Sequence, residues 1–481
     1  MRKNKTIEHM QDNIRDYLNY EKSFDIVKRD VSVADKRGFL VFVDGFAKDD
    51  MMLIILSVLQ QIKHTGYSIT DVKKFIDDNI GYIEVETQTD YEKVSTAVLS
   101  GMSALFIDGF EEVILIDSRT YPARGPEEPD LEKLTRGSHD GLVETLVFNT
   151  ALVRRRIRDK GLFFELLSVG KRSKTDVVLG YIDDLVDQQL LEDIKQKISE
   201  VNVSSLVMSE KSLEEKLVNK PWYNPFPSVR YTERPDVLSA HLLEGHIAII
   251  VDNSPSAMIV PTTFFYFLQS AEDYIHSALV GNFIRFTRLL LLTSSLLLVP
   301  LWLLLVEYVD ILPEWLAFLG PKGDDFAIPL FIQFLILEVG LIGLRITSIH
   351  TPNALSTSLG IIGGLILSQF AIDVGWFVPE TILYMAIVGL GQFATPSIEL
   401  SYAIRIFRLF FLIITGVFSY FGLAPWGLGG SFLIYLIILA TTNTVGKKSY
   451  LWPLIPFNGK KLRQIIFRMP FAKVESETHT K

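Results

Sequence analysis

Few residues of this sequence have the types and spacing that catalysis or metal binding requires. His241 and His246 are five residues apart, so they do not share one helical face, and Glu244 between them does not complete an HExxH zinc motif. The chain has no cysteine, which excludes disulfides, thiolate metal sites and thiol nucleophiles. The sequence therefore predicts a protein that is not an enzyme and needs no metal or other cofactor. A metal at the two histidines stays open as an alternative.

One acidic residue lies inside an apolar stretch. Glu338 falls within residues 326–344, a stretch long and apolar enough to span a membrane. A charge at the bilayer centre costs at least about 2.5 kcal/mol. Its side chain should therefore face water or a protein partner. Repeated around an oligomer, Glu338 would form an acidic ring that favours cations. The alternative is a buried ion pair with Arg345, two turns further along the same helical face.

A face of small residues in the stretch 355–372 is the second candidate site. Gly360 and Gly364 form a GxxxG pair, which allows close helix packing. The functional alternative is a narrow pore wall, in which Leu367 is an apolar gate that closes by dewetting. The pore-lining candidates are Ser356, Gly360, Gly363, Gly364, Leu367, Ser368, Gln369 and Glu338.

A proline-rich junction at residues 220–236 (KPWYNPFPSVRYTERPD) precedes the hydrophobic stretches. Its four prolines exclude helix and central strand, so we expect an extended, stiff connection that transmits motion. Tyr231, Glu233 and Arg234 are the coupling candidates, expected to dock this junction to a neighbour. The alternative is a passive spacer.

A run of arginines at 154–156 and Arg158 ends the helix expected over residues 141–159. It could bind an acidic headgroup or an acidic partner. The alternative is a solvated helix end, where basic side chains complement the helix dipole.

The elements that must position these residues fall into two unlike halves. Short apolar runs typical of strands alternate with helical segments before residue 220, which indicates α/β structure. Six hydrophobic stretches follow, and membrane-spanning helices need about 20 apolar residues. Basic residues, such as Arg345, Arg405 and Arg408, fall on one side of them, which places both termini inside. The stretches are 289–309, 326–344, 355–372, 379–398, 405–424 and 429–446.

The predicted fold is an α/β soluble N-terminal region of two subdomains followed by an α-helical polytopic membrane domain. The net charge of -9 argues against nucleic-acid binding. The expected parts are the first subdomain (1–119), a linker (120–137), the second subdomain (138–220), the proline-rich junction and interfacial segment (221–288), a membrane domain of five to six helices (289–446) and a basic cytoplasmic tail (447–481).

Three segments resemble the A-subunit family of spore germinant receptors (GerA type). They are RGSHDGLVETLVFNTALVRRRI (136–157), NPFPSVRYTERPD (224–236) and LLEGHIAIIVDNSP (242–255), of which YTERPD is the most specific. The order of parts also resembles that family. One departure is Ser138-His139-Asp140, where receptor A subunits usually have proline and a charged pair, which puts a nutrient ligand and a dedicated B subunit in doubt.

The resemblance implies a multi-pass protein of the spore inner membrane, with both termini on the core side, that acts in germination. It implies a homo-oligomer in the lipid bilayer that conducts, or modulates the conduction of, monovalent cations. The implied protein partners are a second small membrane protein or germinant-receptor subunits, with no nucleic acid. The alternatives are a secondary transporter and a non-conducting scaffold that recruits germination partners.

Overall fold

The protein consists of two units, each described here by itself. The structure is a computed structural model that describes residues 6–47, 49–63, 69, 71–79, 85–118, 132–206, 209–218, 220–309, 313, 327–350, 372–446 and 449–469. An α/β unit comprises Met1–Asn219 and Val229–Thr262, and a helical unit comprises Lys220–Ser228 and Thr263–Lys481. The chain therefore passes between the units at three places: after residues 219, 228 and 262.

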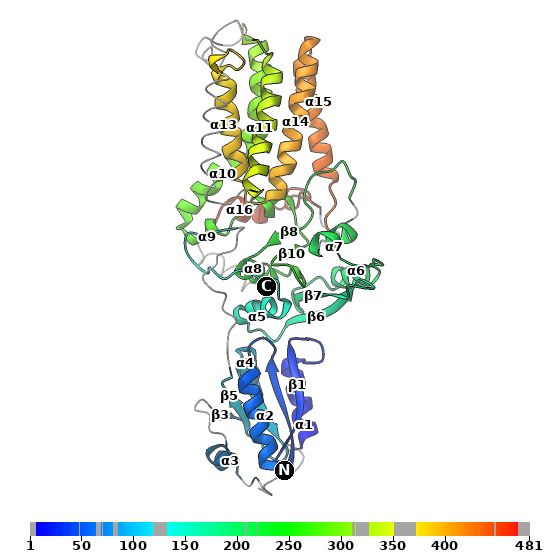
Figure 1. Ribbon diagram of the computed structural model, residues 1–481, viewed down its shortest axis with the longest axis vertical. Helices are drawn as coiled ribbons and strands as arrows, with labels where there is room; N and C mark the ends of the chain where they lie inside the picture. Colours follow the sequence, from blue (N-terminus) through cyan, green and yellow to red (C-terminus); the bar gives the residue numbers. More distant parts are fainter. Residues whose placement is uncertain are drawn as a thin grey trace. The chain divides into compact units, whose positions relative to one another are not determined.

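The first α/β subdomain is an antiparallel sheet with helices on both faces (Figure 1). Its strand order is β1-β2-β4-β5-β3. Side chains alternate along a strand, so Phe39 of β2 packs in the core with α1 and α4, and Leu40 packs in the core with α2 and α3. The elements are α1 (Ile7–Leu18), β1 (Ile26–Val33), β2 (Lys36–Val43), α2 (Asp49–Lys63), α3 (Val72–Asn79), β3 (Val85–Gln88), α4 (Tyr91–Leu99), β4 (Ser103–Ile107) and β5 (Val113–Ile116).

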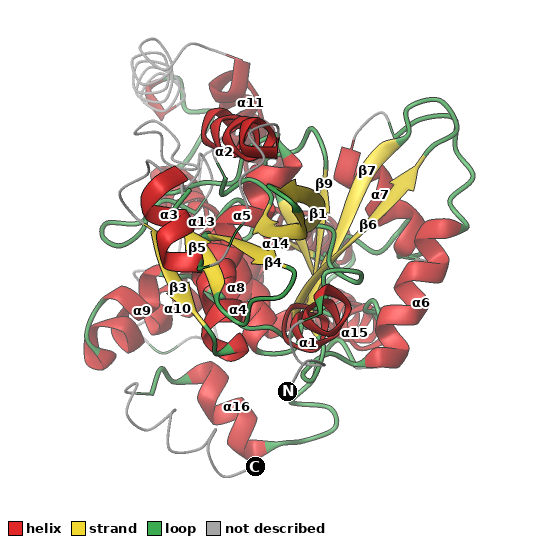
Figure 2. Ribbon diagram, turned by 90° about the horizontal axis from the view of Figure 1, so that it is seen from below, coloured by secondary structure: helices red, strands yellow, loops and turns green. Residues whose placement is uncertain are grey.

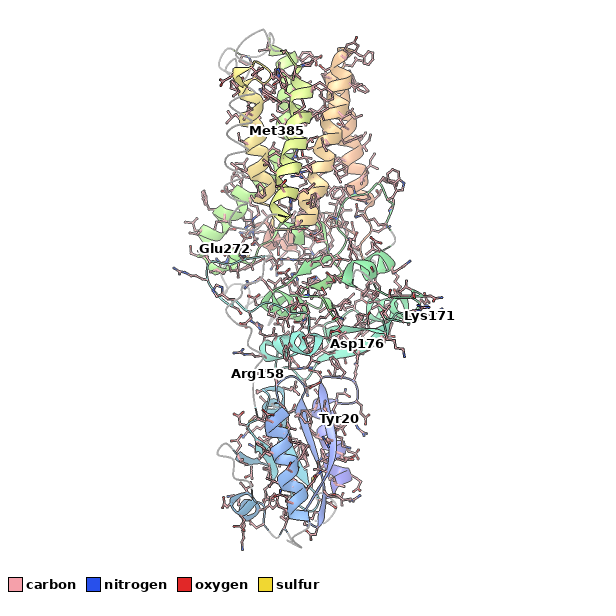
Figure 3. The ribbon with its side chains drawn as sticks, in the orientation of Figure 1. Tyr20, Arg158, Lys171, Asp176, Glu272 and Met385 are labelled. Carbon is pink, nitrogen blue, oxygen red and sulfur yellow. The ribbon has the colours of Figure 1, made fainter. Side chains whose placement is uncertain are left out.

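The second α/β subdomain is another antiparallel sheet, with strand order β6-β7-β9-β10-β8. Strands β6 and β7 form a hairpin with α6 beside it (Figure 2). Lys171 lies in the turn of that hairpin and Asp176 on β7 (Figure 3). The elements are α5 (Leu146–Arg156), β6 (Leu162–Val169), β7 (Thr175–Ile182), α6 (Gln188–Ser199), α7 (Ser209–Leu217), β8 (Arg230–Thr232), α8 (Pro235–Leu243), β9 (Ile247–Val251) and β10 (Ala257–Val260).

The two subdomains repeat one topology. Each runs helix, two strands, two helices, strand, helix, two strands among the described residues. In each sheet the third strand of the subdomain, β3 or β8, lies at the edge beside the fifth, β5 or β10. The expected end of the second subdomain at residue 220 was therefore wrong. Its sheet is completed by β8, β9 and β10, because β8 of the proline-rich junction pairs with β10.

The helical unit contains four helices that are long and apolar enough to cross a membrane, among the residues that the structure describes. Helix α10 packs against both α13 and α14. A Cβ at Gly391 would clash with the carbonyl oxygen of Leu291, so this small residue allows the close approach of α13 to α10. The spans are Ala278–Glu307 (α10), Leu330–Thr347 in α11 (Leu330–His350), Ile398–Tyr420 (α14) and Ala424–Thr441 (α15); the shorter elements are η2 (Phe264–Leu268), α9 (Glu272–Ile275), α13 (Pro379–Phe393) and α16 (Gly459–Ile466).

Several helices begin earlier than the hydrophobic stretches indicated. The first and fifth stretches were expected at 289 and 405, but α10 begins at Ala278 and α14 at Ile398. Ser277 and Ser397 cap these helices, accepting from the backbone N–H groups of Val280 and Leu400. The glycine-rich segment Gly427-Leu428-Gly429-Gly430 lies within α15, so the described chain has no helix break there.

Candidate functional site

A cluster of three buried charges lies among the membrane helices. Glu338 of α11 accepts hydrogen bonds from Arg408 of α14, with Arg408 Nη2 at 2.6 Å from Oε1 and 2.8 Å from Oε2. Arg405 Nε lies 3.3 Å from Glu338 Oε1. The exposed fractions are 2% for Glu338, 4% for Arg405 and 1% for Arg408. The cluster therefore carries one negative and two positive charges in an apolar setting.

Four helices contribute to this charge cluster. Residues three apart on a helix share a face, so Arg405 and Arg408 both point toward α11. Arg408 Nη1 also donates to the carbonyl and hydroxyl oxygens of Ser295 on α10, both at 2.9 Å. Arg405 Nη2 donates to the side-chain carbonyl of Gln392 on α13.

The hydrogen bonding of Arg405 is incomplete in the part of the chain that the structure describes. Its Nε and Nη1 atoms are buried and lack hydrogen-bond partners, as does Nε2 of Gln392. A buried polar group without a partner costs about 1–3 kcal/mol, and more when it is charged. Ionisable residues are rare inside membrane segments, and each is a candidate functional position. The cluster is thus the strongest candidate site of the helical unit.

The structure corrects two expectations about these charges. Arg345 was considered as the partner of Glu338, but its guanidinium lies over the ring of Tyr402, 4.4 Å from the centroid. Arg405 and Arg408 were expected among the basic residues on one side of the hydrophobic stretches and instead lie inside α14. The N-cap pattern of Ser397, followed by acidic Glu399 in the first turn, is the local signal that would have placed them within the helix.

The remaining pore-lining candidates lie outside the described residues. They are Ser356, Gly360, Gly363, Gly364, Leu367, Ser368 and Gln369.

The three coupling candidates make contacts within the second α/β subdomain. The Tyr231 hydroxyl donates to Glu214 Oε2 at 2.6 Å, and the carbonyl of Glu233 accepts from Leu142 N–H at 2.7 Å. Arg234 is fully buried, pairs with Asp236 at 2.7 Å and donates to the carbonyl of Ser138 at 2.8 Å. The expectation that Arg234 docks to a neighbour was wrong, because its guanidinium is enclosed in its own subdomain.

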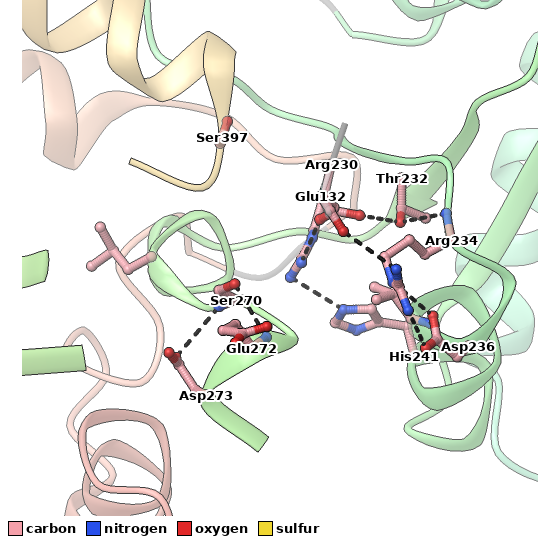
Figure 4. Close-up of polar contacts among 12 residues, drawn as sticks. Glu132, Arg230, Thr232, Arg234, Asp236, His241, Ser270, Glu272, Asp273 and Ser397 are labelled. Carbon is pink, nitrogen blue, oxygen red and sulfur yellow. Dashed lines mark hydrogen bonds and ion pairs between the residues drawn. The ribbon is translucent and has the colours of Figure 1, made fainter. Parts of the chain in front are cut away.

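Glu132 links the strand of this junction to the end of the preceding linker (Figure 4). Its carboxylate accepts from Arg230 Nη2 at 3.2 Å and from the Thr232 hydroxyl at 2.5 Å. Arg230 Nη1 lies 3.4 Å from Nε2 of His241. These contacts fix β8 at the edge of the second sheet.

His241, Glu244 and His246 do come close together, with one candidate ligand atom from each lying within 4.8 Å of the others. Burial is the main cause that lowers the pKa of His241, and the Arg230 guanidinium lowers it further. The imidazole is therefore neutral, as a metal ligand must be. The guanidinium beside Nε2 nevertheless repels a cation, so the chemistry of the site favours hydrogen bonding over metal binding.

The first part of the junction is anchored in the helical unit. Phe226 is fully buried, with ring centroids 5.0 Å from Phe407 and 5.7 Å from Tyr435. The Ser228 hydroxyl donates to the carbonyl of Asn443 at 3.0 Å. Two residues later, Arg230 begins β8 of the α/β unit.

Comparisons with known proteins connect this architecture to spore germination. The family model described as Bacillus/Clostridium GerA spore germination protein matches residues 12–480. Stage V sporulation protein AF of Bacillus subtilis (strain 168) is 40% identical over 482 residues, which cover 97% of this chain and 96% of that protein. Spore germination protein GerLA of Bacillus cereus is 29% identical and covers 95% of this chain and 92% of that protein.

One solved structure is also similar. The crystal structure of the N-terminal domain of the A subunit of the Bacillus megaterium spore germinant receptor GerK3 is 25% identical, with a TM-score of 0.42. The match covers 54% of this chain and 96% of that chain.

Proposed function

Because the chain belongs to the GerA family of spore germination proteins, we propose that it is a membrane subunit that forms or modulates an ion channel during germination. The channel releases monovalent cations from the spore core, and the subunit is a homo-oligomer in the spore inner membrane. The observation that carries this proposal is the charge cluster of Glu338, Arg405 and Arg408 inside apolar helices. Paired charges inside membrane helices are rare, and they mark proteins that move or sense ions, whether or not the charges line the ion path itself.

The cluster itself is not the proposed cation path. Two arginines surround one carboxylate, and the excess positive charge repels cations. Glu338 therefore does not supply a free acidic ring. The proposed path runs between copies of the chain, along the small-residue face that the sequence predicts for 355–372.

The orientation and partners belong to the same proposal. The termini face the spore core, because Arg345 and the basic tail then lie on the inner side of the membrane, where membrane proteins carry an excess of Lys and Arg. Germinant-receptor subunits or a second small membrane protein are the proposed partners, which is supported by the similarity to spore germination protein KA of Bacillus subtilis (strain 168) and GerLA of Bacillus cereus.

Ion flux through the purified protein tests the proposal directly. In liposomes, potassium flux that rises linearly with the driving force indicates a channel, and saturable coupled flux indicates a transporter. Absence of flux with and without germinant-receptor subunits indicates a scaffold and contradicts the proposal.

Leu367→Ser is expected to increase potassium leak, because a hydroxyl wets an apolar constriction. Gly364→Leu is expected to reduce flux, because its side chain narrows the same passage. The measurement is potassium release from spores that express each variant at matched abundance. If both variants only lower protein abundance and neither changes flux per molecule, the small residues pack helices and do not line a pore.

The junction offers a second test, since it joins two anchors with almost no slack. Ser228 is fixed in the helical unit and Arg230 in a strand of the α/β unit, and two residues span at most about 7 Å. Inserting Gly-Ser-Gly-Ser between Ser228 and Val229 keeps every anchor and adds slack, so we expect severalfold slower germination at normal abundance.

The matched control is the same insertion between Glu127 and Glu128, in the linker expected at 120–137. It adds the same length at a place that does not join the two units, so germination should be unchanged. Normal kinetics with the insertion after Ser228 would show that the junction is a passive spacer.

A further inference from the structure

A cavity of about 340 Å³ lies beside the first turns of α10 in the helical unit. Its walls are mainly apolar and come from η2, α10, the turn before α14 and the end of α16. Phe286, Leu289 and Leu292 of α10 follow helical spacing, so one face of this membrane helix lines the cavity. The other lining residues are Phe265, Leu268, Gln269, Asn282, Arg285, Arg288, Thr395, Pro396, Ile465, Ile466 and Phe467.

Arg285 lines this cavity and is only 8% exposed. Its Nε donates to Asp273 Oδ2 at 3.1 Å, and its Nη1 donates to the carbonyl of Ile465 at 2.6 Å. Its Nη2 is buried and has no hydrogen-bond partner among the described residues. A guanidinium donor left unpaired in an apolar environment is costly, so a ligand that accepts from it is favoured.

The local charge determines the sign of that ligand. Arg288 donates to both oxygens of Asp273, at 3.0 and 2.8 Å, so one buried carboxylate serves two guanidiniums. The three side chains carry a net charge of about +1. The ligand should therefore bring one negative charge that accepts hydrogen bonds, and a phosphate suits a guanidinium in this role.

The apolar walls determine the rest of the ligand. A free phosphate would leave most of the cavity without contacts, whereas an acyl chain would fill it. The cavity lies at the start of a candidate membrane span, and basic pockets between such helices bind lipid headgroups. We infer that this cavity is a site for one anionic phospholipid, with its phosphate at Arg285 Nη2 and an acyl chain against Phe286 and Leu289.

This inference does not depend on ion conduction, so it can be tested by binding alone. We expect the full-length protein, purified in detergent, to retain phosphatidylglycerol over phosphatidylcholine by about tenfold. The phosphate of either lipid can accept from Arg285, but the choline ammonium of phosphatidylcholine would add a positive charge beside Arg285 and Arg288. The measurement is native mass spectrometry after exchange into equimolar mixtures of the two lipids. Arg285→Gln should abolish the preference.

Leu289→Trp is the second variant, because it fills the cavity and leaves the polar contacts of Arg285 intact. This variant should lose the bound lipid. In the absence of lipid, it should unfold at the same temperature as the lipid-free wild-type protein. Leu290→Trp is its matched control: Leu290 is 57% exposed on the same helix, does not line the cavity, and its replacement should keep the lipid.

Two results would overturn the inference. Equal retention of the two lipids by the wild-type protein would show that the cavity does not recognise an anionic headgroup. The second result is phosphatidylglycerol binding that appears only when the chain is truncated after residue 469. The occupant of the cavity would then be the chain's own tail, which carries Glu475 and Glu477.

Discussion

Glu338→Gln is expected to destabilise the helical unit by about 3–5 kcal/mol, because it leaves two buried arginines without a counter-charge. In the wild-type protein the carboxylate offsets one of two positive charges. Glutamine removes that charge and leaves the arginines to repel each other in a low-dielectric environment. Thermal unfolding of the purified full-length protein in detergent measures the effect, and the midpoint should fall by roughly 6–20 °C.

Removing charges in balance should restore part of this stability. Glu338→Gln combined with Arg408→Gln returns the cluster to a net charge of +1, so the double variant should be more stable than Glu338→Gln alone. Arg408→Gln alone should be tolerated better than Glu338→Gln, because Arg405 Nε still lies 3.3 Å from Glu338. This ordering depends on the pairing and not on the size of the side chains.

Glu307→Gln is the matched control for this series. Glu307 lies at the end of α10, and its carboxylate accepts from the exposed Ser419 hydroxyl at 2.6 Å. Its loss should cost less than about 1 kcal/mol. If Glu338→Gln were as mild as this control but changed ion selectivity, Glu338 would face water, as the acidic-ring interpretation of the sequence supposed.

The elements of the fold were largely predictable, because they depend on local patterns. Continuous apolar runs are the local signal for β2, β4 and β5, and two such runs on either side of Asn253 are the local signal for the hairpin of β9 and β10. Strand β8 was missed because it has only three residues within the proline-rich junction. Its strand character comes from pairing with β10, which local sequence does not encode.

The contacts of the candidate site were less predictable. Glu338 was recognised as a charge that needs a partner, but that partner, Arg408, is 70 residues further along the chain. Hydropathy alone indicated that α14 begins near residue 405, since the arginines interrupt its apolar pattern. The arginines can lie inside an apolar helix because α11 packs against α14 and buries Glu338 beside them.

The arginine run at the end of α5 shows the same limit. Neither a solvated helix end nor an acidic-ligand site describes Arg154, which is fully buried. Its Nε donates to Asp25 Oδ2 at 3.0 Å and its Nη2 to Asp25 Oδ1 at 3.2 Å. Asp25 belongs to the first subdomain and Arg154 to the second, so this two-point ion pair joins the two copies of the topology.

Asp25→Ala is therefore expected to destabilise the α/β unit by about 3–5 kcal/mol, because it leaves Arg154 buried and unpaired. Thermal unfolding of the full-length protein should show the first subdomain melting earlier, and protease should cut the region between the subdomains faster. Lys22→Gln is the control: its pair with Asp183 joins the same subdomains but is 36–43% exposed, so its loss should cost under about 1 kcal/mol. Replacing both Asp25 and Arg154 by leucine should recover stability, because the cost of the single variant comes from the unpaired charge. Equal losses for Asp25→Ala and Lys22→Gln would mean that the buried ion pair does not hold the subdomains together.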